Sequence, residues 1–328
     1  FNKNNFDLLR LLAAFQVVIV HGILHLKVEF LYPLMNFLNF FPGVPVFFFL
    51  SGLLISAAWE RNSDLKSYFG NRFYRIFPAL WFCVFLCTIT IIILSYILNK
   101  EFSFSLLLLW SLMQSTLFPQ WNPEFLNWFG IGVVNGSLWT IPVELSFYIL
   151  MPILYIFSKK LKFSLNLVFT LLMLISFTIF YILILSSPVH EIQILLNKLI
   201  GFSFIPWLGM FCVGVLVQRN MHVLYPLVVN KAFIFLIIFI GISFAGSFFY
   251  NPVLFGTAND VGILNYIFLC TFVLSFGYTN PSLSDKLLKR NDISYGIYIY
   301  HMPIFNSLIL FNFSGLNGLY LGLLLTLI

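Results

Sequence analysis

Residues 76–98 read IFPALWFCVFLCTITIIILSYIL, a run without a single charged side chain. A helix of this length extends roughly 35 Å, which is enough to cross the ~30 Å hydrocarbon core of a bilayer. Of all 328 residues, 61% are hydrophobic and only 9% are charged, against about a quarter in soluble domains. A soluble protein could not hide so much apolar surface, because large exposed apolar patches drive association. The composition therefore predicts an all-α polytopic membrane protein. A transmembrane β-barrel is excluded, because its strands would alternate apolar and polar residues.

Ten apolar runs are expected to be transmembrane helices. Their limits are about 8–26, 42–59, 76–98, 137–158, 163–186, 199–217, 232–250, 261–279, 293–312 and 316–328. The last run is too short to span alone, so we expect it to continue past these residues and the chain to be trimmed at both ends. An eleventh run, 102–118, is short and contains Ser and Gln, so it could span the membrane or lie at its surface.

The distribution of positive charge decides between these two possibilities. With ten spans and a cytoplasmic N-terminus, 14 of the 17 Lys and Arg residues face the cytoplasm, and only Lys27, Lys100 and Lys198 face out. If 102–118 also spanned, only 7 would lie inside and 10 outside. Membrane proteins concentrate Lys and Arg on the cytoplasmic side, so we predict ten spans with both termini cytoplasmic. The same loop positions account for the net charge of +6, so nucleic acid is not expected as a partner.

One integral-membrane domain is predicted over residues 1–328, because no internal repeat or shift in composition divides the chain. Residues 99–136 would then form a long segment on the outer side. This segment contains Pro119, Trp121 and Pro123 together with several glycines. Long loops of this kind are usually functional, so we expect an outer lid.

The first span carries ionisable side chains, which are costly at membrane depth and therefore mark functional-site candidates. Arg10 and His21 are 11 residues apart, which places them on one helix face and roughly 16 Å apart along its axis. His25 follows one turn further out. Each also has a structural alternative: Arg10 could extend to the membrane surface, and the histidines could be hydrogen-bonded packing residues.

Glu144 is the only carboxylate well inside a predicted span, in GSLWTIPVELSFY (136–148). His21 is expected at a similar depth, ~8–10 Å below the outer boundary. A buried carboxylate near a histidine can fix the tautomer of the ring and raise its basicity. The alternative is that Glu144 pairs with an arginine and fixes helix packing.

Arg72 and Arg75 form an Arg-x-x-Arg pair just before the third span. On a helix, residues three apart share a face, so two guanidinium groups would lie together at the cytoplasmic surface. This arrangement suits phosphate, whereas ordinary positive-inside anchoring is the alternative.

Two further polar positions lie mid-span. His301 is followed by Pro303, which would loosen the local backbone hydrogen bonding. Ser51 precedes Gly52, and close helix packing is favoured there over a nucleophilic serine, because the sequence is not a Gly-x-Ser-x-Gly elbow. No metal-binding or nucleotide-fold motif is present, and the four cysteines are expected to be small apolar packing residues, so no metal is predicted.

Four ordered blocks resemble the acyltransferase 3 family, integral-membrane O-acyltransferases that modify bacterial surface polysaccharides. The first is FDLLRLLAAFQVVIVH, with Arg10 and His21; the second is FFFLSGLLIS followed by NRFYRIFPALW, with Arg72 and Arg75. The third is GSLWTIPVELSFYILMP, with Trp139, Glu144 and Tyr148, and the last is ISYGIYIYHMP, with Ser294, Tyr298 and His301. The blocks extend over residues 6–303, and the predicted ten spans also fit the family.

The resemblance implies transfer of an acyl group, usually acetyl, from acyl-CoA to a sugar hydroxyl at the bacterial cytoplasmic membrane. His21 would be the base that removes the hydroxyl proton, or the residue that carries the acyl group, and Glu144 would orient it. Arg10, Arg72 and Arg75 would hold the phosphates of acyl-CoA from the cytoplasmic side. Ser51, Trp139, Tyr148 and His301 would have supporting roles.

The expected partners are a glycan acceptor from the outer side, acyl-CoA from the cytoplasm and membrane lipid. No bound cofactor is expected, because acyl-CoA is a substrate. A flippase for a lipid-linked sugar is the competing function, and a glycan polymerase is a weaker one. A flippase would not need the Arg72 and Arg75 pair. The acceptor glycan and the oligomeric state stay open.

Overall fold

The computed structural model describes residues 3–116, 118–186, 190–249, 251–289 and 291–327. Within these residues every regular element is helical, and no strand is present. The α-helices are α1 Phe6–His25, α2 Tyr32–Leu38, α3 Gly43–Arg61, α4 Leu65–Ile97, α5 Phe104–Gln114, α6 Thr140–Leu161, α7 Leu165–Leu185, α8 Glu191–Phe202, α9 Leu208–Arg219, α10 Met221–Val228, α11 Ala232–Gly246, α12 Pro252–Phe255, α13 Ile263–Gly277, α14 Leu283–Leu288, α15 Ser294–Leu310 and α16 Gly315–Leu327. Short 3₁₀ helices are η1 Glu29–Leu31, η2 Glu124–Leu126, η3 Gly136–Trp139 and η4 Ala258–Asp260. The predicted all-α class is confirmed over the described residues.

Several helices are long and apolar enough to cross a membrane. By length and composition, the described residues contain five such segments: Phe6–His25, Glu29–Arg61, Leu65–Ile97, Gly136–Leu161 and Leu165–Leu185. A sixth is the pair α9 and α10, if the 89° bend between them lies within one span. Shorter apolar helices are Phe104–Gln114, Ala232–Gly246, Ile263–Gly277 and Gly315–Leu327. These elements fit a multi-pass membrane protein, whereas the count of ten spans and the side of each terminus stay predictions.

The predicted span over 199–217 is not a continuous helix. The chain leaves helical geometry after Phe202 and resumes it at Leu208. Pro206 lies in this break and has no backbone N–H to donate. The buried hydroxyl of Ser176 stabilises the break, because it donates to the Ile205 carbonyl oxygen at 2.6 Å and accepts from the Gly209 N–H at 2.6 Å. These two backbone groups therefore find a partner inside the protein, as a break within a membrane span would require.

The chain divides into two compact units. The first contains Phe1–Ala13, Asn39–Tyr68 and Val143–Asp292, and the second contains Ala14–Leu38, Phe69–Pro142 and Ile293–Ile328. Helix α1 therefore contributes residues 6–13 to one unit and residues 14–25 to the other.

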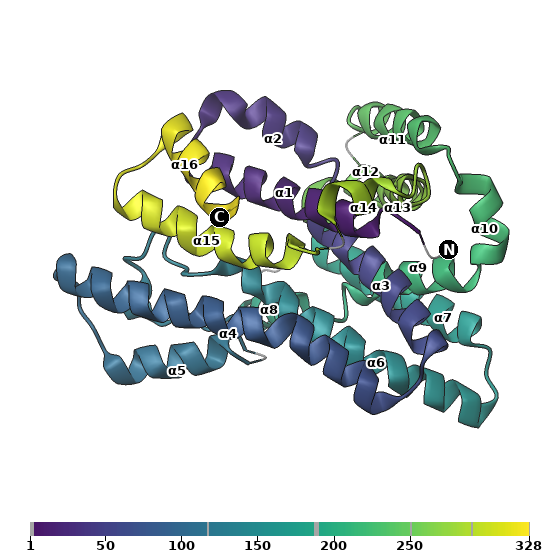
Figure 1. The fold of residues 1–328 in the computed structure, drawn as a ribbon, viewed down its shortest axis with the longest axis horizontal. Helices are drawn as coiled ribbons and strands as arrows, with labels where there is room; N and C mark the ends of the chain where they lie inside the picture. The colour runs from purple at the N-terminus through teal and green to yellow at the C-terminus, as the bar shows by residue number, and fades with distance from the viewer. Residues whose placement is uncertain (1–2, 117, 187–189, 250, 290, 328) are drawn as a thin grey trace. The chain divides into compact units, whose positions relative to one another are not determined.

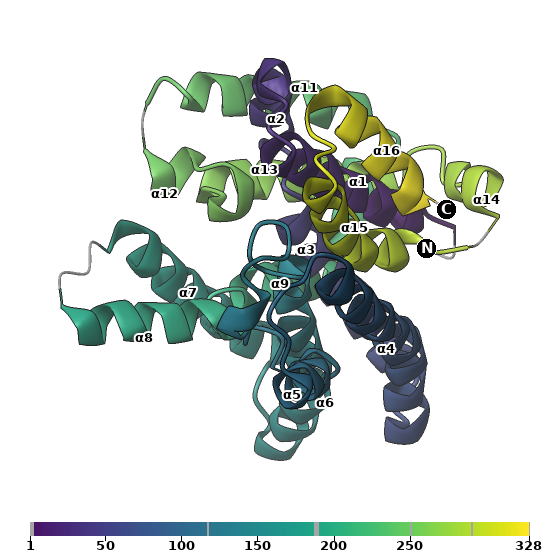
Figure 2. The same cartoon turned by 90° about the vertical axis from the view of Figure 1, so that its left-hand side faces the viewer.

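Close helix packing forms the core of the first unit. A Cβ atom added to Gly52 on α3 would lie 2.0 Å from the carbonyl oxygen of Phe211, and one added to Gly214 on α9 would lie 2.1 Å from that of Phe49. The two helices approach this closely only because both contact positions lack a side chain. Helices α11 and α13 of the same unit run side by side, with α12 near their ends (Figure 2).

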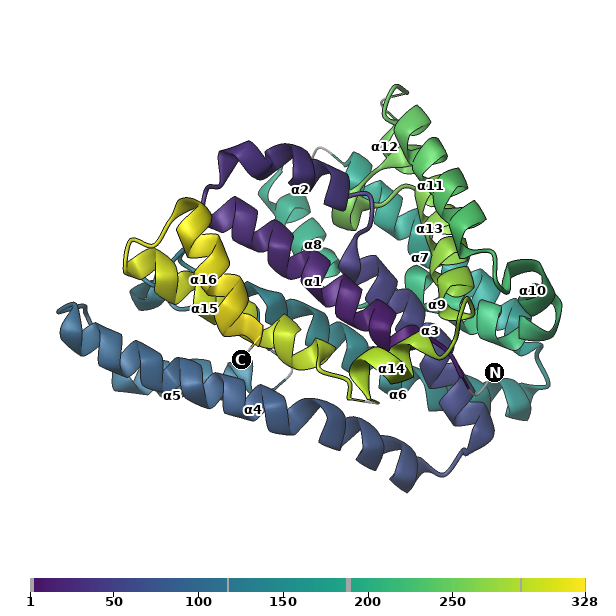
Figure 3. The ribbon, with the colours of Figure 1, turned by 45° about the horizontal axis from the view of Figure 1, so that its top comes forward.

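In the second unit, α15 packs along α16 (Figure 1) and α5 lies beside α4 (Figure 3). The second pair is held by a hydrogen bond of 2.8 Å between Thr88 and Ser111, and by the Trp81 indole N–H, which donates to the Ser115 carbonyl oxygen. Helix α5 has 11 residues and is therefore only roughly 16 Å long.

Candidate active site

The backbone of α15 is interrupted at Pro303. Because proline has no N–H, the carbonyl oxygen of Ile299, four residues earlier, loses its usual helical partner. The side-chain amide of Asn135 donates to this oxygen at 2.9 Å, and the thiol of Cys83 lies 3.4 Å from it. Two segments distant in sequence therefore meet α15 at the proline predicted to loosen it.

His301 lies next to this interruption and is completely buried. Its Nδ1 atom lies 2.6 Å from the carbonyl oxygen of Tyr298. A carbonyl oxygen can only accept, so Nδ1 of His301 carries the proton. In the neutral ring Nε2 is then an acceptor.

The acceptor nitrogen of His301 faces His21 of α1. Nε2 of His301 and Nδ1 of His21 are 2.9 Å apart, so His21 must donate from Nδ1. In a neutral His21 ring the remaining nitrogen, Nε2, then has a free lone pair. The chain from Tyr298 through His301 to His21 thus determines which nitrogen of His21 can accept a proton.

A glycine next to His21 allows this approach. A Cβ atom added to Gly22 would lie 2.9 Å from the ring of Phe305 on α15 and 2.6 Å from Leu319 on α16. The Phe305 ring also packs edge-on against the His301 imidazole, with ring centroids 6.0 Å apart. The contact of α1 with both C-terminal helices therefore holds the two histidines at hydrogen-bonding distance.

Further polar groups continue the network toward η3. The Tyr298 hydroxyl donates to the Ser137 carbonyl oxygen at 3.2 Å and accepts from Thr140 at 3.1 Å. The Ser137 hydroxyl donates to the side-chain oxygen of Asn135 at 2.6 Å. These side chains are buried, so the unit contains a connected polar network in an apolar surrounding.

The segment before this network is fixed to α15 by Asn306. Its amide nitrogen donates to the carbonyl oxygens of Val133 and Val134, both at 2.9 Å, and its oxygen accepts from the Ile131 N–H at 3.0 Å. Gly130 has φ of +56°, and a Cβ there would lie 2.1 Å from the Asn306 side-chain oxygen. Part of the predicted lid, 99–136, therefore has a defined conformation.

Glu144 lies on α6, in the first unit. Its Oε1 accepts from the Tyr148 hydroxyl, one helical turn later, at 2.5 Å and from the Ser51 hydroxyl of α3 at 3.3 Å. Tyr148 and Ser51 therefore both contact the Glu144 carboxylate. The neighbouring Gly52 makes the close contact between α3 and α9. The Nδ1 atom of His21 has His301 as its partner, so an orienting role of Glu144 toward His21 stays a prediction.

Known proteins resemble this chain over nearly its whole length. A family model described as an acyltransferase domain matches residues 3–328. The chain belongs to the acyltransferase 3 family. No solved structure matches it.

Curated relatives of this acyltransferase include three bacterial or phage proteins. Nodulation protein 10 of Rhizobium leguminosarum bv. viciae is 29% identical over 96% of this chain and 86% of its own length. The O-acetyl transferase of Shigella phage Sf6 is 28% identical over 92% of this chain and 84% of its own. The peptidoglycan O-acetyltransferase OatA of Listeria monocytogenes is 25% identical over 80% of this chain, and the match covers 44% of OatA.

The predicted arginines of this acyltransferase lie in different surroundings. Arg10 is buried, and its guanidinium lies 3.5 Å from Asp292 and 3.7 Å from Asp7, so two carboxylates balance its charge. Arg72 and Arg75 both belong to α4, half-buried and exposed respectively, and share a face as the spacing predicts. Their role in binding phosphate stays a prediction, as does that of Arg10.

Trp139 ends η3, half-buried, directly before the α6 helix that carries Glu144. His25 packs against His21 with ring centroids 5.5 Å apart. In the part of the chain that the structure describes, no group of three or more His, Cys, Asp or Glu side chains could hold a metal ion.

Several residues of the network were missed by the sequence analysis. Asn306 lies within an apolar run, and Asn135 lies in the predicted loop, so neither had a signal of its own. One clue was available: Pro303 frees the carbonyl of Ile299, and a buried free carbonyl requires a donor. That clue calls for a donor but cannot say which residue provides it.

Proposed function

We propose that this acyltransferase transfers an acetyl group from acetyl-CoA to a hydroxyl of a cell-envelope or exported glycan. The names of two relatives, an O-acetyl transferase and a peptidoglycan O-acetyltransferase, support the reaction class. The observation that carries the proposal is the hydrogen bond between His21 and His301, because it leaves one imidazole nitrogen of His21 ready to accept a proton.

The chemistry follows from that free nitrogen. A sugar hydroxyl is a poor nucleophile at neutral pH, so a base must remove its proton as it attacks the thioester carbonyl. Nε2 of His21 accepts this proton, and the resulting imidazolium keeps its Nδ1–H bond to His301. The intermediate then expels the CoA thiolate, which takes the proton from His21. The same lone pair could instead attack the thioester and form an acyl-His21 intermediate, and single-turnover trapping of labelled acetyl on the protein separates these two routes.

Glu144 has a separate place in this proposal. The hydroxyl groups of Tyr148 and Ser51 both donate hydrogen bonds to its carboxylate. We retain Glu144 as the second candidate catalytic residue, with Ser51, Tyr148 and Trp139 supporting it.

The proposed arrangement in the bacterial cytoplasmic membrane has ten spans and both termini in the cytoplasm. Arg72 and Arg75, with Arg10 as a further candidate, would then hold the CoA phosphates on the cytoplasmic side. The segment 99–136 would face outward with the glycan. Single-cysteine labelling in intact cells tests this: Lys100→Cys should react with an impermeant maleimide and Lys160→Cys should not. Reaction of both, or of Lys160→Cys alone, would refute the topology.

The function is tested by measuring O-acetyl groups on extracted surface glycan by proton NMR. Cells lacking the protein are compared with cells expressing it or its His21→Ala variant at equal membrane levels. We expect acetyl signal only with the intact protein. If deletion removes the glycan from the surface and His21→Ala restores it, the protein is a flippase and the acyltransferase proposal fails.

A further inference from the structure

A cavity of about 780 Å³ lies within the first unit, where the ends of α3, α6 and α9 meet the start of α7. We call it the basic pocket and define it by Trp59, Glu60, Tyr155, Lys159, Lys162 and Arg219, which line it. Its volume is within the range of roughly 300–1,000 Å³ found for small-molecule sites. None of these residues belongs to the polar network of His21 and His301.

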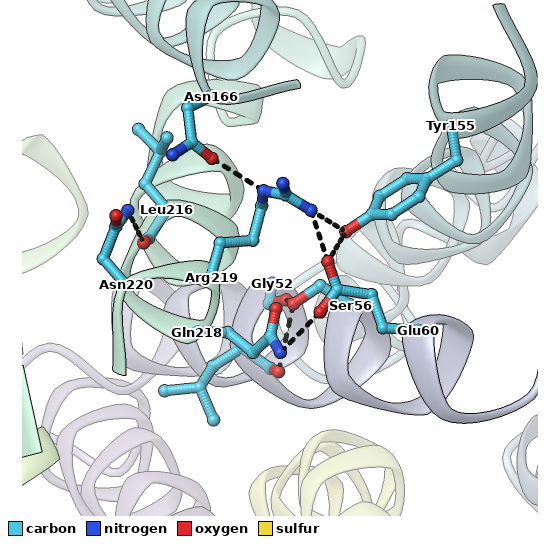
Figure 4. A network of polar contacts seen from close by, with 10 residues as sticks. Gly52, Ser56, Glu60, Tyr155, Asn166, Leu216, Gln218, Arg219 and Asn220 are labelled. Atoms are coloured by element: carbon cyan, nitrogen blue, oxygen red, sulfur yellow. Dashed lines mark hydrogen bonds and ion pairs between the residues drawn. The ribbon is translucent and has the colours of Figure 1, made fainter. Parts of the chain in front are cut away.

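The single carboxylate of this lining is already neutralised. Glu60 accepts from Arg219 and, at 2.7 Å, from the Tyr155 hydroxyl through the same oxygen. Its second oxygen accepts from the Gln218 amide at 3.0 Å (Figure 4). Arg219 is also held by Asn166, whose side-chain oxygen accepts from its Nε at 2.7 Å. The Glu60 and Arg219 pair is therefore a fixed structural element of the wall.

Lys159 and Lys162 remain as two positive charges of the lining. Both side chains are exposed and line the pocket. Neither ammonium group forms a hydrogen bond or ion pair with another described residue. Two unbalanced charges beside a cavity attract an anion, and lysine ammonium groups commonly bind phosphate.

Flat aromatic surface accompanies these charges. Trp59 is buried and packs edge-on against Tyr68, with ring centroids 5.1 Å apart, and Tyr155 stacks its ring under the Arg219 guanidinium at 5.7 Å. The exposed ring of Phe163 lines the same cavity. An exposed aromatic ring such as that of Phe163 can hold a nucleobase by stacking.

We propose that the basic pocket binds a phosphorylated nucleoside, namely the adenosine bisphosphate end of the CoA donor. This inference rests on the proposed function. The 3′-phosphate would bind Lys159 and Lys162, and the adenine would pack on the aromatic side chains of the pocket. Arg72 and Arg75 would not belong to this site. The end of α6, which carries Lys159, and the following Lys162 are predicted to be cytoplasmic, the side on which CoA is available.

The test measures binding of adenosine 3′,5′-bisphosphate to the purified full chain in nanodiscs of neutral lipid. Lys159→Gln with Lys162→Gln should weaken binding at least tenfold, and more at low than at high salt. Lys160→Gln is the matched control, because Lys160 is exposed but does not line the cavity, and it should bind normally. Thermal unfolding of each variant establishes that it is folded.

Each other outcome identifies a specific failure. Equal binding by the double variant and the control would show that the basic pocket does not bind the nucleotide, while leaving the proposed function intact. Acetyl-CoA that binds neither wild type nor variants would refute the proposed function itself. If the double variant keeps the nucleotide but loses co-purified anionic lipid, detected by native mass spectrometry in nanodiscs containing phosphatidylglycerol, the pocket binds a lipid phosphate and the nucleotide proposal is wrong.

Discussion

Nδ1 of His21 and Nε2 of His301 are 2.9 Å apart, although 280 positions separate the two residues in the sequence. The Tyr298 carbonyl oxygen, 2.6 Å from Nδ1 of His301, fixes the direction of this hydrogen bond. Two histidines that could each be packing residues therefore form an ordered pair, in which Nε2 of His21 has a free lone pair.

His21 is the proposed base. His21→Ala should lower the rate of O-acetyl transfer by roughly 10²–10⁴-fold, because general base catalysis contributes about that factor. The rate is measured with labelled acetyl-CoA in membranes at equal protein levels. His190→Ala, an exposed position outside both networks, should keep full activity. Equal rates for His21→Ala and wild type would contradict the role of His21.

His301 should act through His21. His301→Leu should lower kcat by roughly 10–100-fold with little change in KM for acetyl-CoA, since a hydrogen-bond partner that orients a functional histidine typically contributes about this much. His301→Gln offers a carbonyl oxygen as a replacement acceptor and should recover part of the loss. In the His21→Ala background, His301→Leu should have no further effect on kcat. Additive losses in the double variant would show that His301 does not work through His21.

The Glu144 carboxylate should depend on its donor from Tyr148. Tyr148→Phe should lower the free energy of unfolding by about 1.5–3 kcal/mol, because a hydrogen bond to a charged group is lost. Chemical unfolding in detergent gives this value. Tyr320→Phe, at an exposed position, is the control and should change stability little. A neutral result for Tyr148→Phe would mean that the carboxylate does not need this donor.

The contact of α3 with α9 should be intolerant of any added side chain. Gly52→Ala should destabilise the protein by roughly 1–3 kcal/mol or more, since the new Cβ would overlap the carbonyl of Phe211. Gly70→Ala on α4 meets no atom within 4 Å and should be neutral or stabilising. The apparent Tm in detergent distinguishes the two variants, and equal Tm values would contradict the close packing.

Asn306 should hold the segment that precedes η3. Asn306→Leu removes three hydrogen bonds and leaves buried backbone groups without partners, so residues 119–134 should become sensitive to protease in proteoliposomes. Ser307→Ala is the neighbouring control, because its hydroxyl donates within its own helix to Pro303. Unchanged cleavage in Asn306→Leu would show that other contacts fix the segment.

The helical class and the positions of most apolar helices could be predicted from the sequence alone, because continuous apolar runs of this length have few other stable states. The sequence also placed Arg72 and Arg75 on one helix face, since that depends only on local spacing. The break at Ser203–Trp207 was missed, because a buried hydroxyl 27 or more residues earlier, on Ser176, supplies its hydrogen bonds.

Which polar groups meet depends on how the helices pack in three dimensions. The pairing of His21 with His301, the donor from Asn135 to Ile299, and the closure of the basic pocket all join helices distant in the chain. A linear pattern shows that a buried polar group must have a partner, but helix packing selects that partner. For this acyltransferase, the sequence therefore indicated which single residues are candidates for the chemistry. It did not indicate the direction of the hydrogen bonds that would make His21 a base.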